Sequence, residues 1–196
     1  MKIGILGAGN VGTRLAELAR AAGHDVLVGS RKGEASLADA SRHGDIVLIA
    51  VHYHAVEDAL KPLSELLAGK IVIDATNPLN DDWSPRMLGE NTSAGEEIAK
   101  LLPNSKIVKA FNTVFADIMN TEGLSRNGSA VSAFVASDHD DAVKTVADFA
   151  KSIGFAPVTS NKLMVARYLE AIAHLNIELA VGQGGGTNAA FLYHRG

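Results

Sequence analysis

The chain has 196 residues, with 18 Lys and Arg against 22 Asp and Glu, a net charge of -4 and a pI near 5.9. This length and its 47% hydrophobic content suit one globular domain. The weakly acidic balance argues against nucleic-acid and membrane-surface partners, which need basic patches, and no apolar run is long enough to span a bilayer. With 0 cysteines, disulfides and thiolate-bound metals are excluded, and a reducing cytoplasm is the expected location.

Short apolar runs alternate with amphipathic stretches along the chain. Runs rich in Val and Ile predict buried strands at residues 2–6, 26–29, 46–50, 70–74, 106–110 and 130–135. The periodicity between them predicts helices at residues 11–22, 54–67, 94–102 and 140–152. Ser93 and Glu96 have the spacing of a helix cap, and Gly23 and Gly154 are expected helix stops. The alternation predicts a Rossmann-type, doubly wound α/β fold with a mainly parallel sheet.

The first predicted strand leads directly into a glycine-rich turn, Gly7-Ala8-Gly9-Asn10-Val11-Gly12, which opens the first helix. In this context Gly7 permits the tight turn, Gly9 lets the backbone approach a pyrophosphate, and Gly12 lets the helix pack on the strand. The amide groups at the start of the helix would hold the pyrophosphate. The pattern predicts a dinucleotide site; a simple tight turn is the alternative.

The end of the second strand indicates which dinucleotide is bound. An NAD site usually places a carboxylate there, whereas this chain has Ser30, Arg31 and Lys32, and its Asp25 stands at the beginning of the strand. A hydroxyl and two cations match a 2′-phosphate, with Arg31 as the fork onto its oxygens. We therefore expect NADP(H), against the alternative of a solvated turn with two surface cations.

Ligands of open α/β sheets lie beyond the carboxyl ends of the strands. Three predicted strand ends therefore supply further cofactor-binding candidates: Ala50, Val51, His52, Thr76, Asn77, Pro78, Ala110, Phe111, Asn112 and Thr113. His52 and His54 lack the carboxylate neighbours and the spacing of a metal site, so no metal is expected. Residues 77–91 form the longest predicted loop, and its place directly after a strand is typical of a binding loop.

After Phe155 only 41 residues remain, too few for a second domain. We expect one NADP-binding domain, 1–196, in which residues 155–196 add a helix at 162–181 and a glycine-rich loop. That loop carries four glycines suited to lie against a flat ring, Gly182, Gly184, Gly185 and Gly186. The apolar residues 189–193 follow it and predict that the segment folds back onto the domain; a flexible linker to a frayed tail is the alternative.

Together the segments at 7–12, 29–31, 74–78 and 108–113 and the glycine-rich close resemble the NADPH-dependent reductases of the deazaflavin coenzyme F420. The cytosolic oxidoreductase domain of the STEAP ferric reductases is similar in the same places, including His52-x-His54. The resemblance covers nearly the whole chain and implies direct hydride transfer between NADP and a deazaflavin or flavin ring, with F420, FMN or FAD as co-substrate. The segment between Lys32 and Asp45 is shorter than in that family, and we expect no transmembrane haem domain.

Carried over by position, the resemblance implies that Ser30 and Arg31 hold the 2′-phosphate, and that His52 and residues 110–113 border the nicotinamide. It also implies that residues 182–186 border the second ring. His52 is the one catalytic candidate, as a proton relay or a ring-orienting group. A homodimer is implied as well, with the 162–181 helix as its interface. Two other functions stay open, a non-enzymatic NADPH sensor or interaction module and, less favoured, a reductase of a small carbonyl or imine substrate.

Overall fold

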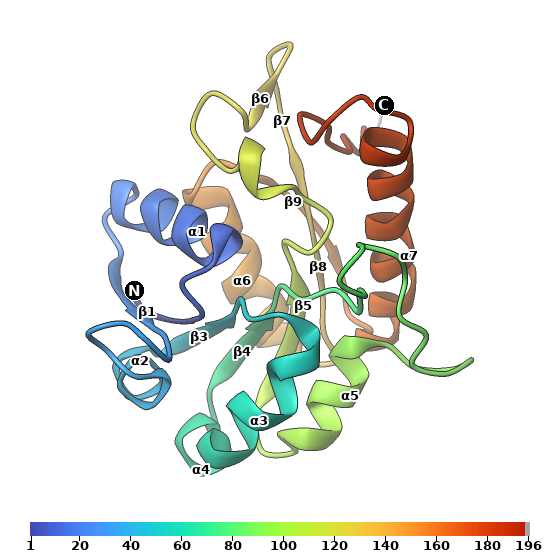
Figure 1. The fold of residues 1–196 in the computed structure, drawn as a ribbon. Coiled ribbons are helices and arrows are strands. Elements are labelled where there is room, and N and C mark those ends of the chain that lie inside the picture. Colours follow the sequence, from blue (N-terminus) through green and yellow to red (C-terminus); the bar gives the residue numbers. More distant parts are fainter. Residues whose placement is uncertain (195–196) are drawn as a thin grey trace.

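The computed structural model describes residues 1–194 and is built around one seven-stranded sheet with the order β2-β1-β3-β4-β5-β8-β9 (Figure 1). The strands are β1 (Lys2–Leu6), β2 (Asp25–Gly29), β3 (Ile46–Ile49), β4 (Ile71–Asp74), β5 (Lys106–Ala110), β8 (Ser132–Ala136) and β9 (Ala156–Ser160). The first five are parallel, β8 is antiparallel to β5, and β9 is parallel to β8. The predicted doubly wound α/β class with a mainly parallel sheet is confirmed.

Helices cover both faces of this sheet. The helices are α1 (Asn10–Ala21), α2 (Leu37–His43), α3 (Val56–Leu60), α4 (Ser64–Leu67), α5 (Ala94–Leu101), α6 (Asp140–Ser152) and α7 (Ala166–Ile177). Alternate residues along the strands point to opposite faces, so β1 sends Ile5 into the core beneath α1 and α6 and Leu6 into the core beneath α2 to α5. These two apolar layers hold the strands in place and so fix the positions of their carboxyl ends.

Several predicted elements differ from the structure in instructive ways. The helix expected at 54–67 begins with a 3-10 turn over Tyr53–Ala55 and continues as α3, a second 3-10 turn over Lys61–Leu63, and α4. The break between α3 and α4 arises because Pro62 lacks the N–H that a continuous helix requires. The strand β9 was not predicted. Pro157 weakens its strand pattern, but β9 lies at the sheet edge, where one missing N–H is tolerated. A two-stranded hairpin, β6 (Ser125–Arg126) and β7 (Ser129–Ala130), precedes β8.

Three predicted local features are confirmed. The Ser93 side chain accepts a hydrogen bond from the N–H of Glu96 at the start of α5. Gly23 and Gly154 follow α1 and α6 with φ of 80° and 100°. The tail folds back on β8, where the Ser132 N–H donates to the carbonyl oxygen of Phe191 at 3.2 Å and the Tyr193 N–H donates to Ser132 Oγ at 2.8 Å.

The predicted C-terminal helix is present in three pieces, a 3-10 turn (Leu163–Val165), α7 and a π-helical turn (Glu178–Gly182). Figure 1 shows α7 running alongside the loop that connects β4 to α5. This placement brings the end of the chain to the side of the sheet where the carboxyl ends of β3, β4 and β5 lie. None of the helices in residues 1–194 is long and apolar enough to cross a membrane.

Candidate functional site

The glycine-rich turn after β1 has the geometry of a phosphate loop. Gly7 has φ of 119°, and a Cβ there would lie 2.5 Å from the carbonyl oxygen of Ala50; a Cβ at Gly12 would lie 2.0 Å from the carbonyl oxygen of Gly7. Neither position therefore accepts a side chain. Gly9 is the N-cap residue of α1 and provides no side-chain hydrogen bond to the helix, and the first turn holds no acidic residue. The N–H groups and positive end of this twelve-residue helix are left for an anion.

Two cations stand beyond the end of β2. Arg31 and Lys32 are exposed, and neither forms an ion pair with another described residue. The Ser30 N–H donates to the carbonyl oxygen of Ala35 at 3.0 Å, which closes the short loop that carries them. Asp25 pairs in register with Lys2 at the opposite end of the strand. The loop after β2 therefore presents positive charge, as a 2′-phosphate requires.

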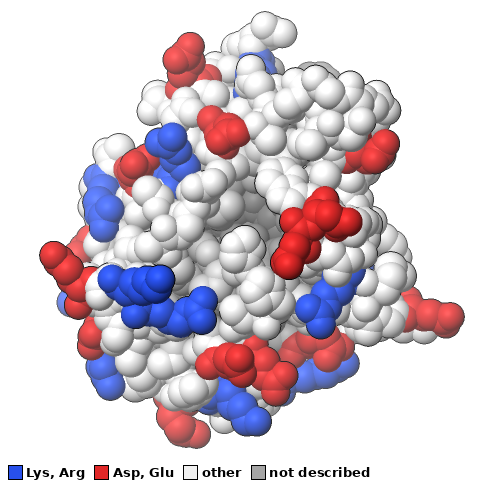
Figure 2. Space-filling model, viewed as in Figure 1, with Lys and Arg blue, Asp and Glu red and all other residues white. Residues whose placement is uncertain are grey.

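A cavity of about 560 Å³ begins at the start of α1 and crosses the ends of β3, β4 and β5. Ten predicted residues line it: Gly9, Asn10, Val11, Ala50, Val51, His52, Thr76, Asn77, Asn112 and Thr113. Figure 2 shows this face hollowed at its centre, with basic side chains gathered on the side of α2. Three strand ends that are far apart in the sequence thus meet around one space.

The other predicted residues lie outside the cavity lining. The lining does not include Gly7, Gly12, Ser30, Arg31, Lys32 and Pro78, and Gly182, Gly184, Gly185 and Gly186 are exposed beyond α7. Ala110 and Phe111 are packed in the core. The centroid of the Phe111 ring lies 5.3 Å from that of Phe155. Ala110 and Phe111 can therefore contribute to binding only through their backbone.

The cavity has further lining residues. Tyr53, His54, Leu79 and Asn80 directly follow the predicted strand-end residues, and the same rule points to them. Sequence reasoning did not single out the remaining lining residues individually: Asp81, Trp83, Val114, Phe115, Ala116, Ala173, Asn176 and Ile177. His54 is exposed in a 3-10 turn (Tyr53–Ala55) directly before α3, as expected for the first turn of a surface helix, and its ring stacks on that of His52, with centroids 5.5 Å apart. Leu79 to Trp83 belong to the loop at 77–91, which the sequence singled out as a whole. The residues of α7 carry no local motif, and only the tertiary fold brings them to the site.

Three asparagines fix the backbone around the cavity. Asn77 Nδ2 donates to the carbonyl oxygen of Asn112 at 2.7 Å, and Asn112 Nδ2 donates to Asn77 Oδ1 at 2.9 Å and to the carbonyl oxygen of Leu169 at 3.1 Å. Asn176 Nδ2 donates to the carbonyl oxygen of Thr113 at 3.2 Å. These bonds join the ends of β4 and β5 to α7. Phe111 supports the turn with a φ of 65°, a strained value for a bulky residue.

Asn112 and His174 each keep one buried atom without a hydrogen-bond partner, Asn112 Oδ1 and His174 Nε2. Both hydrogens of the Asn112 amide already point to carbonyl oxygens, so its Oδ1 is fixed as a free acceptor. Such an acceptor beside the cavity suits an amide N–H, which the carboxamide of nicotinamide supplies. Burial holds the pKa of His174 below its ordinary value, so this ring is neutral at pH 7.

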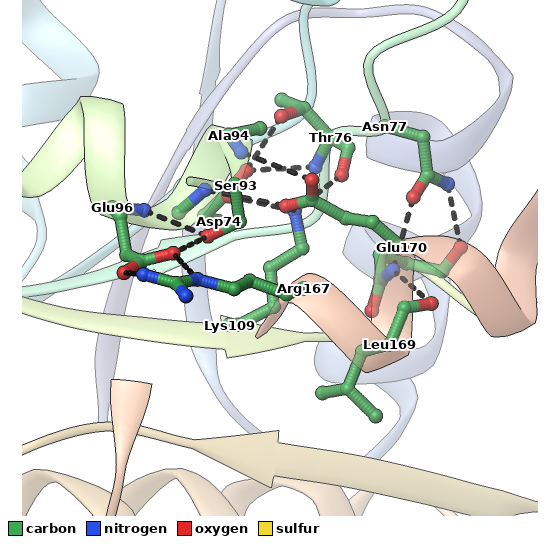
Figure 3. A network of polar contacts seen from close by, with 12 residues as sticks. Asp74, Thr76, Asn77, Ser93, Ala94, Glu96, Lys109, Arg167, Leu169 and Glu170 are labelled. Carbon is green, nitrogen blue, oxygen red and sulfur yellow. Dashed lines mark hydrogen bonds and ion pairs between the residues drawn. The ribbon is translucent and has the colours of Figure 1, made fainter. Parts of the chain in front are cut away.

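A buried ionic cluster lies behind the ends of β4 and β5 (Figure 3). Lys109 Nζ lies 2.8 Å from Asp74 Oδ2, 2.8 Å from Glu170 Oε1 and 2.7 Å from the carbonyl oxygen of Thr76. Burial alone would lower the pKa of Lys109, but the two carboxylates outweigh it and the pKa is raised. Glu170 also accepts from the N–H of Ala94 at 3.0 Å, which links α7 to the start of α5.

This cluster positions cavity residues. Asp74 Oδ1 accepts from both the N–H and the Oγ1 of Thr76, at 2.8 and 2.7 Å, so the orientation of Thr76 depends on a carboxylate that Lys109 holds. Nearby, burial followed by the charges of Glu97, Glu170 and Asp74 raises the pKa of Tyr53 to about 12. Its phenol therefore keeps its proton at neutral pH. The described residues contain no group of three or more His, Asp or Glu that could hold a metal ion.

The parallel sheet, the glycine turn at the head of α1 and the cavity at the strand ends define a dinucleotide-binding protein of the Rossmann type. Comparison with known proteins identifies the family. Residues 2–78 match the family model described as NADP oxidoreductase, coenzyme F420-dependent. The crystal structure of a candidate F420-dependent NADP reductase from Arthrobacter sp. FB24 superposes with a TM-score of 0.89 at 30% identity, over 100% of both chains. The chain belongs to this family of NADP-dependent oxidoreductases.

Two curated relatives cover most of the chain. An F420-dependent NADP reductase from Methanocaldococcus jannaschii is 29% identical over 211 residues, with 92% of this chain and 93% of that protein covered. The metalloreductase STEAP3 of Rattus norvegicus is 32% identical over 186 residues, or 87% of this chain. The chain spans only about a third (36%) of the length of that metalloreductase. Both resemblances expected from the sequence are confirmed.

Proposed function

We propose that the protein transfers a hydride between NADP(H) and a flat redox ring, either the deazaflavin of F420 or the flavin of FMN or FAD. The cavity carries this proposal, because one space joins the start of α1, the ends of three strands and the loop at 77–91. Its volume of about 560 Å³ falls within the range of small-molecule sites. The curated relatives named as F420-dependent NADP reductases support the choice of acceptor.

In this proposal the N–H groups at the start of α1 hold the pyrophosphate. Ser30, Arg31 and Lys32 hold the 2′-phosphate. Thr76 and Asn112 border the nicotinamide, which supplies the hydride when the cofactor is bound. Transfer between two stacked rings depends mainly on proximity and orientation, for which well-placed groups can supply roughly 7–11 kcal/mol. The asparagine bonds and the ionic cluster behind the strand ends supply that rigidity.

The reaction must also account for one proton. NADPH gives up a hydride, and the acceptor ring takes up that hydride together with one proton, so the products are NADP⁺ and the two-electron-reduced ring. His52 is the side chain we propose for relaying this proton or orienting the ring, since it lines the cavity. Tyr53 is poorly suited to the task near neutral pH because its pKa is about 12.

We also infer that two copies associate through α7. Apolar side chains are exposed at a helical spacing along this part of the chain: Met164, Tyr168, Leu175 and Leu179. An exposed apolar stripe of this kind is typical of an association surface. The test is analytical ultracentrifugation, in which wild type should sediment as a dimer and Leu175→Glu as a monomer. A monomeric wild type would contradict this part of the proposal.

The deciding experiment is anaerobic NADPH oxidation, followed at the absorbance band of the reduced nicotinamide, with F420, FMN and FAD offered in turn. Rapid oxidation with at least one ring supports the proposal. Tight NADPH binding without oxidation by any ring would favour a sensor. Oxidation only with small carbonyl or imine substrates would favour a reductase of that class, and the same assay covers these substrates.

A further inference from the structure

Trp83 has an unusual backbone conformation in the loop between β4 and α5. Its N–H donates to the carbonyl oxygen of Asn80 at 3.0 Å, and the Asn80 N–H donates to the carbonyl oxygen of Ser84 at 2.9 Å. This is a three-residue hairpin turn in which Trp83 occupies the left-handed position, with φ of 67°. That position normally takes glycine, because a side chain is strained there.

The rest of the hairpin enforces this conformation. Asp82 Oδ1 accepts from the N–H and the Oγ of Ser84 at 3.0 and 2.6 Å, and Asn80 Nδ2 donates to Ser84 Oγ at 2.9 Å. Leu79 and Pro85 form a bridge across the base of the loop. A strained residue held by so many bonds is characteristic of ligand clamps.

Trp83 forms part of the wall of the cavity. Although Trp83 lines the cavity, 48% of the residue remains exposed. Packing in the protein core therefore does not account for a large aromatic residue at a glycine position. Thr76 and Asn112, at the strand ends where the nicotinamide is placed, line the same cavity.

We propose that Trp83 is the positioning residue for the acceptor: its indole stacks on the face of the acceptor ring that is turned away from the nicotinamide. This inference rests on the proposed function, and it narrows the substrate class to flat aromatic rings. Two stacked faces, nicotinamide on one side and indole on the other, hold such a ring parallel to the hydride donor. A small carbonyl or imine compound offers no comparable face to the indole.

The experiment compares Trp83→Phe, Trp83→Leu and Trp83→Gly with wild type, using F420 and FMN as probes. We expect Trp83→Leu and Trp83→Gly to raise the KM for the ring about 10-fold, as expected for loss of aromatic stacking, and Trp83→Phe to raise it much less. The dissociation constant of NADPH should stay unchanged in all three. Trp83→Gly should also melt higher than Trp83→Leu, because glycine relieves the strain. Met87→Ala, in the same loop but 83% exposed and outside the cavity, is the control and should match wild type.

A binding measurement separates this inference from the proposed function. The chain contains a single tryptophan, Trp83, so the indole fluorescence reports on this residue alone. Saturable quenching by FMN or F420 in the presence of NADP⁺, with an altered visible band of the ring that Trp83→Leu abolishes, supports stacking even if no ring is turned over. Turnover with an unchanged KM in Trp83→Leu overturns the inference and leaves the proposed function intact. Equal loss of NADPH affinity and ring affinity in all three variants also overturns it, since the residue would then be structural.

Discussion

The two ends of the cavity are built by different means. At the phosphate end, one continuous segment, β1 with its glycine turn and α1, creates the site from backbone geometry. At the acceptor end, β4, β5, the loop at 77–91 and α7 meet through side-chain hydrogen bonds and buried charges. A backbone-built site tolerates changes in distant residues, whereas the acceptor end depends on partners up to about a hundred residues apart. Cofactor binding and turnover should therefore respond separately to mutation.

The largest effect is expected from removing the tail. Deletion after Val181 should abolish turnover while NADPH affinity stays nearly unchanged. We propose that residues 182–186, which lie outside the cavity lining in this structure, border the second ring once it is bound, and every dinucleotide signal lies before Val114. NADPH fluorescence titration and the anaerobic assay measure the two quantities, and circular dichroism confirms that the truncated protein is folded. Strongly weakened NADPH binding by a folded protein would show that the two ends are not independent.

Removing the buried cation should destabilise the acceptor end. Lys109→Met leaves Asp74 and Glu170 as uncompensated buried charges, which we expect to lower the free energy of unfolding by about 3–5 kcal/mol. Urea denaturation measures the change. Lys144→Met is the matched control, since Lys144 pairs with Asp148 on the surface and its loss should have no measurable effect. Similar small changes in both variants would mean that the buried cluster contributes no stability.

At the phosphate end, Arg31→Ala should weaken NADPH binding by about 10–100-fold and leave NADH binding unchanged, because the lost charge-assisted hydrogen bonds of about 1.5–3 kcal/mol involve only the 2′-phosphate. Dissociation constants for both nucleotides at one ionic strength provide the test. Ser30→Ala and Lys32→Ala should have smaller effects. Equal weakening of NADH and NADPH would instead assign Arg31 to the fold or to the adenine.

The smallest expected effect is a change in how the stability of the protein depends on alkaline pH. The pKa of Tyr53 is raised to about 12 from 10.0, so the folded chain holds this proton more tightly than the unfolded chain. The stabilisation of the folded state by this difference in pKa is fully present below pH 10. It is lost as the pH rises towards 12, so the free energy of unfolding falls in that pH range. Tyr53→Phe should therefore lose less stability than wild type between pH 8 and pH 11 in thermal denaturation. Parallel losses in the two proteins would contradict the shift.

The glycine turn before α1 and the exposed cations after β2 could be predicted because their signal is local. Glycines, a helix start and two cations stand within 26 residues, from Gly7 to Lys32, and their spacing alone determines the turn. The acceptor end has no such signal. Nothing near Lys109 indicates that Glu170 will neutralise it, and nothing near Trp83 in the pattern of hydrophobic residues indicates a left-handed turn. The general rule for parallel sheets found Thr76, Asn77, Asn112 and Thr113 at the ends of β4 and β5, and the loop at 77–91 was singled out only as a whole.

The buried cluster has a consequence for biosynthesis. Glu170 is 61 residues further along the chain than Lys109, so a ribosome adding about 5–20 residues per second supplies it roughly 3–12 seconds later. During that interval the nascent chain has Asp74 but not Glu170 to compensate the ammonium group in the centre of the sheet. We expect β4 and β5 to reach their native packing only once α7 has emerged from the ribosome. Until then the part of the nascent chain that contains β4 and β5 is the part most in need of protection by chaperones.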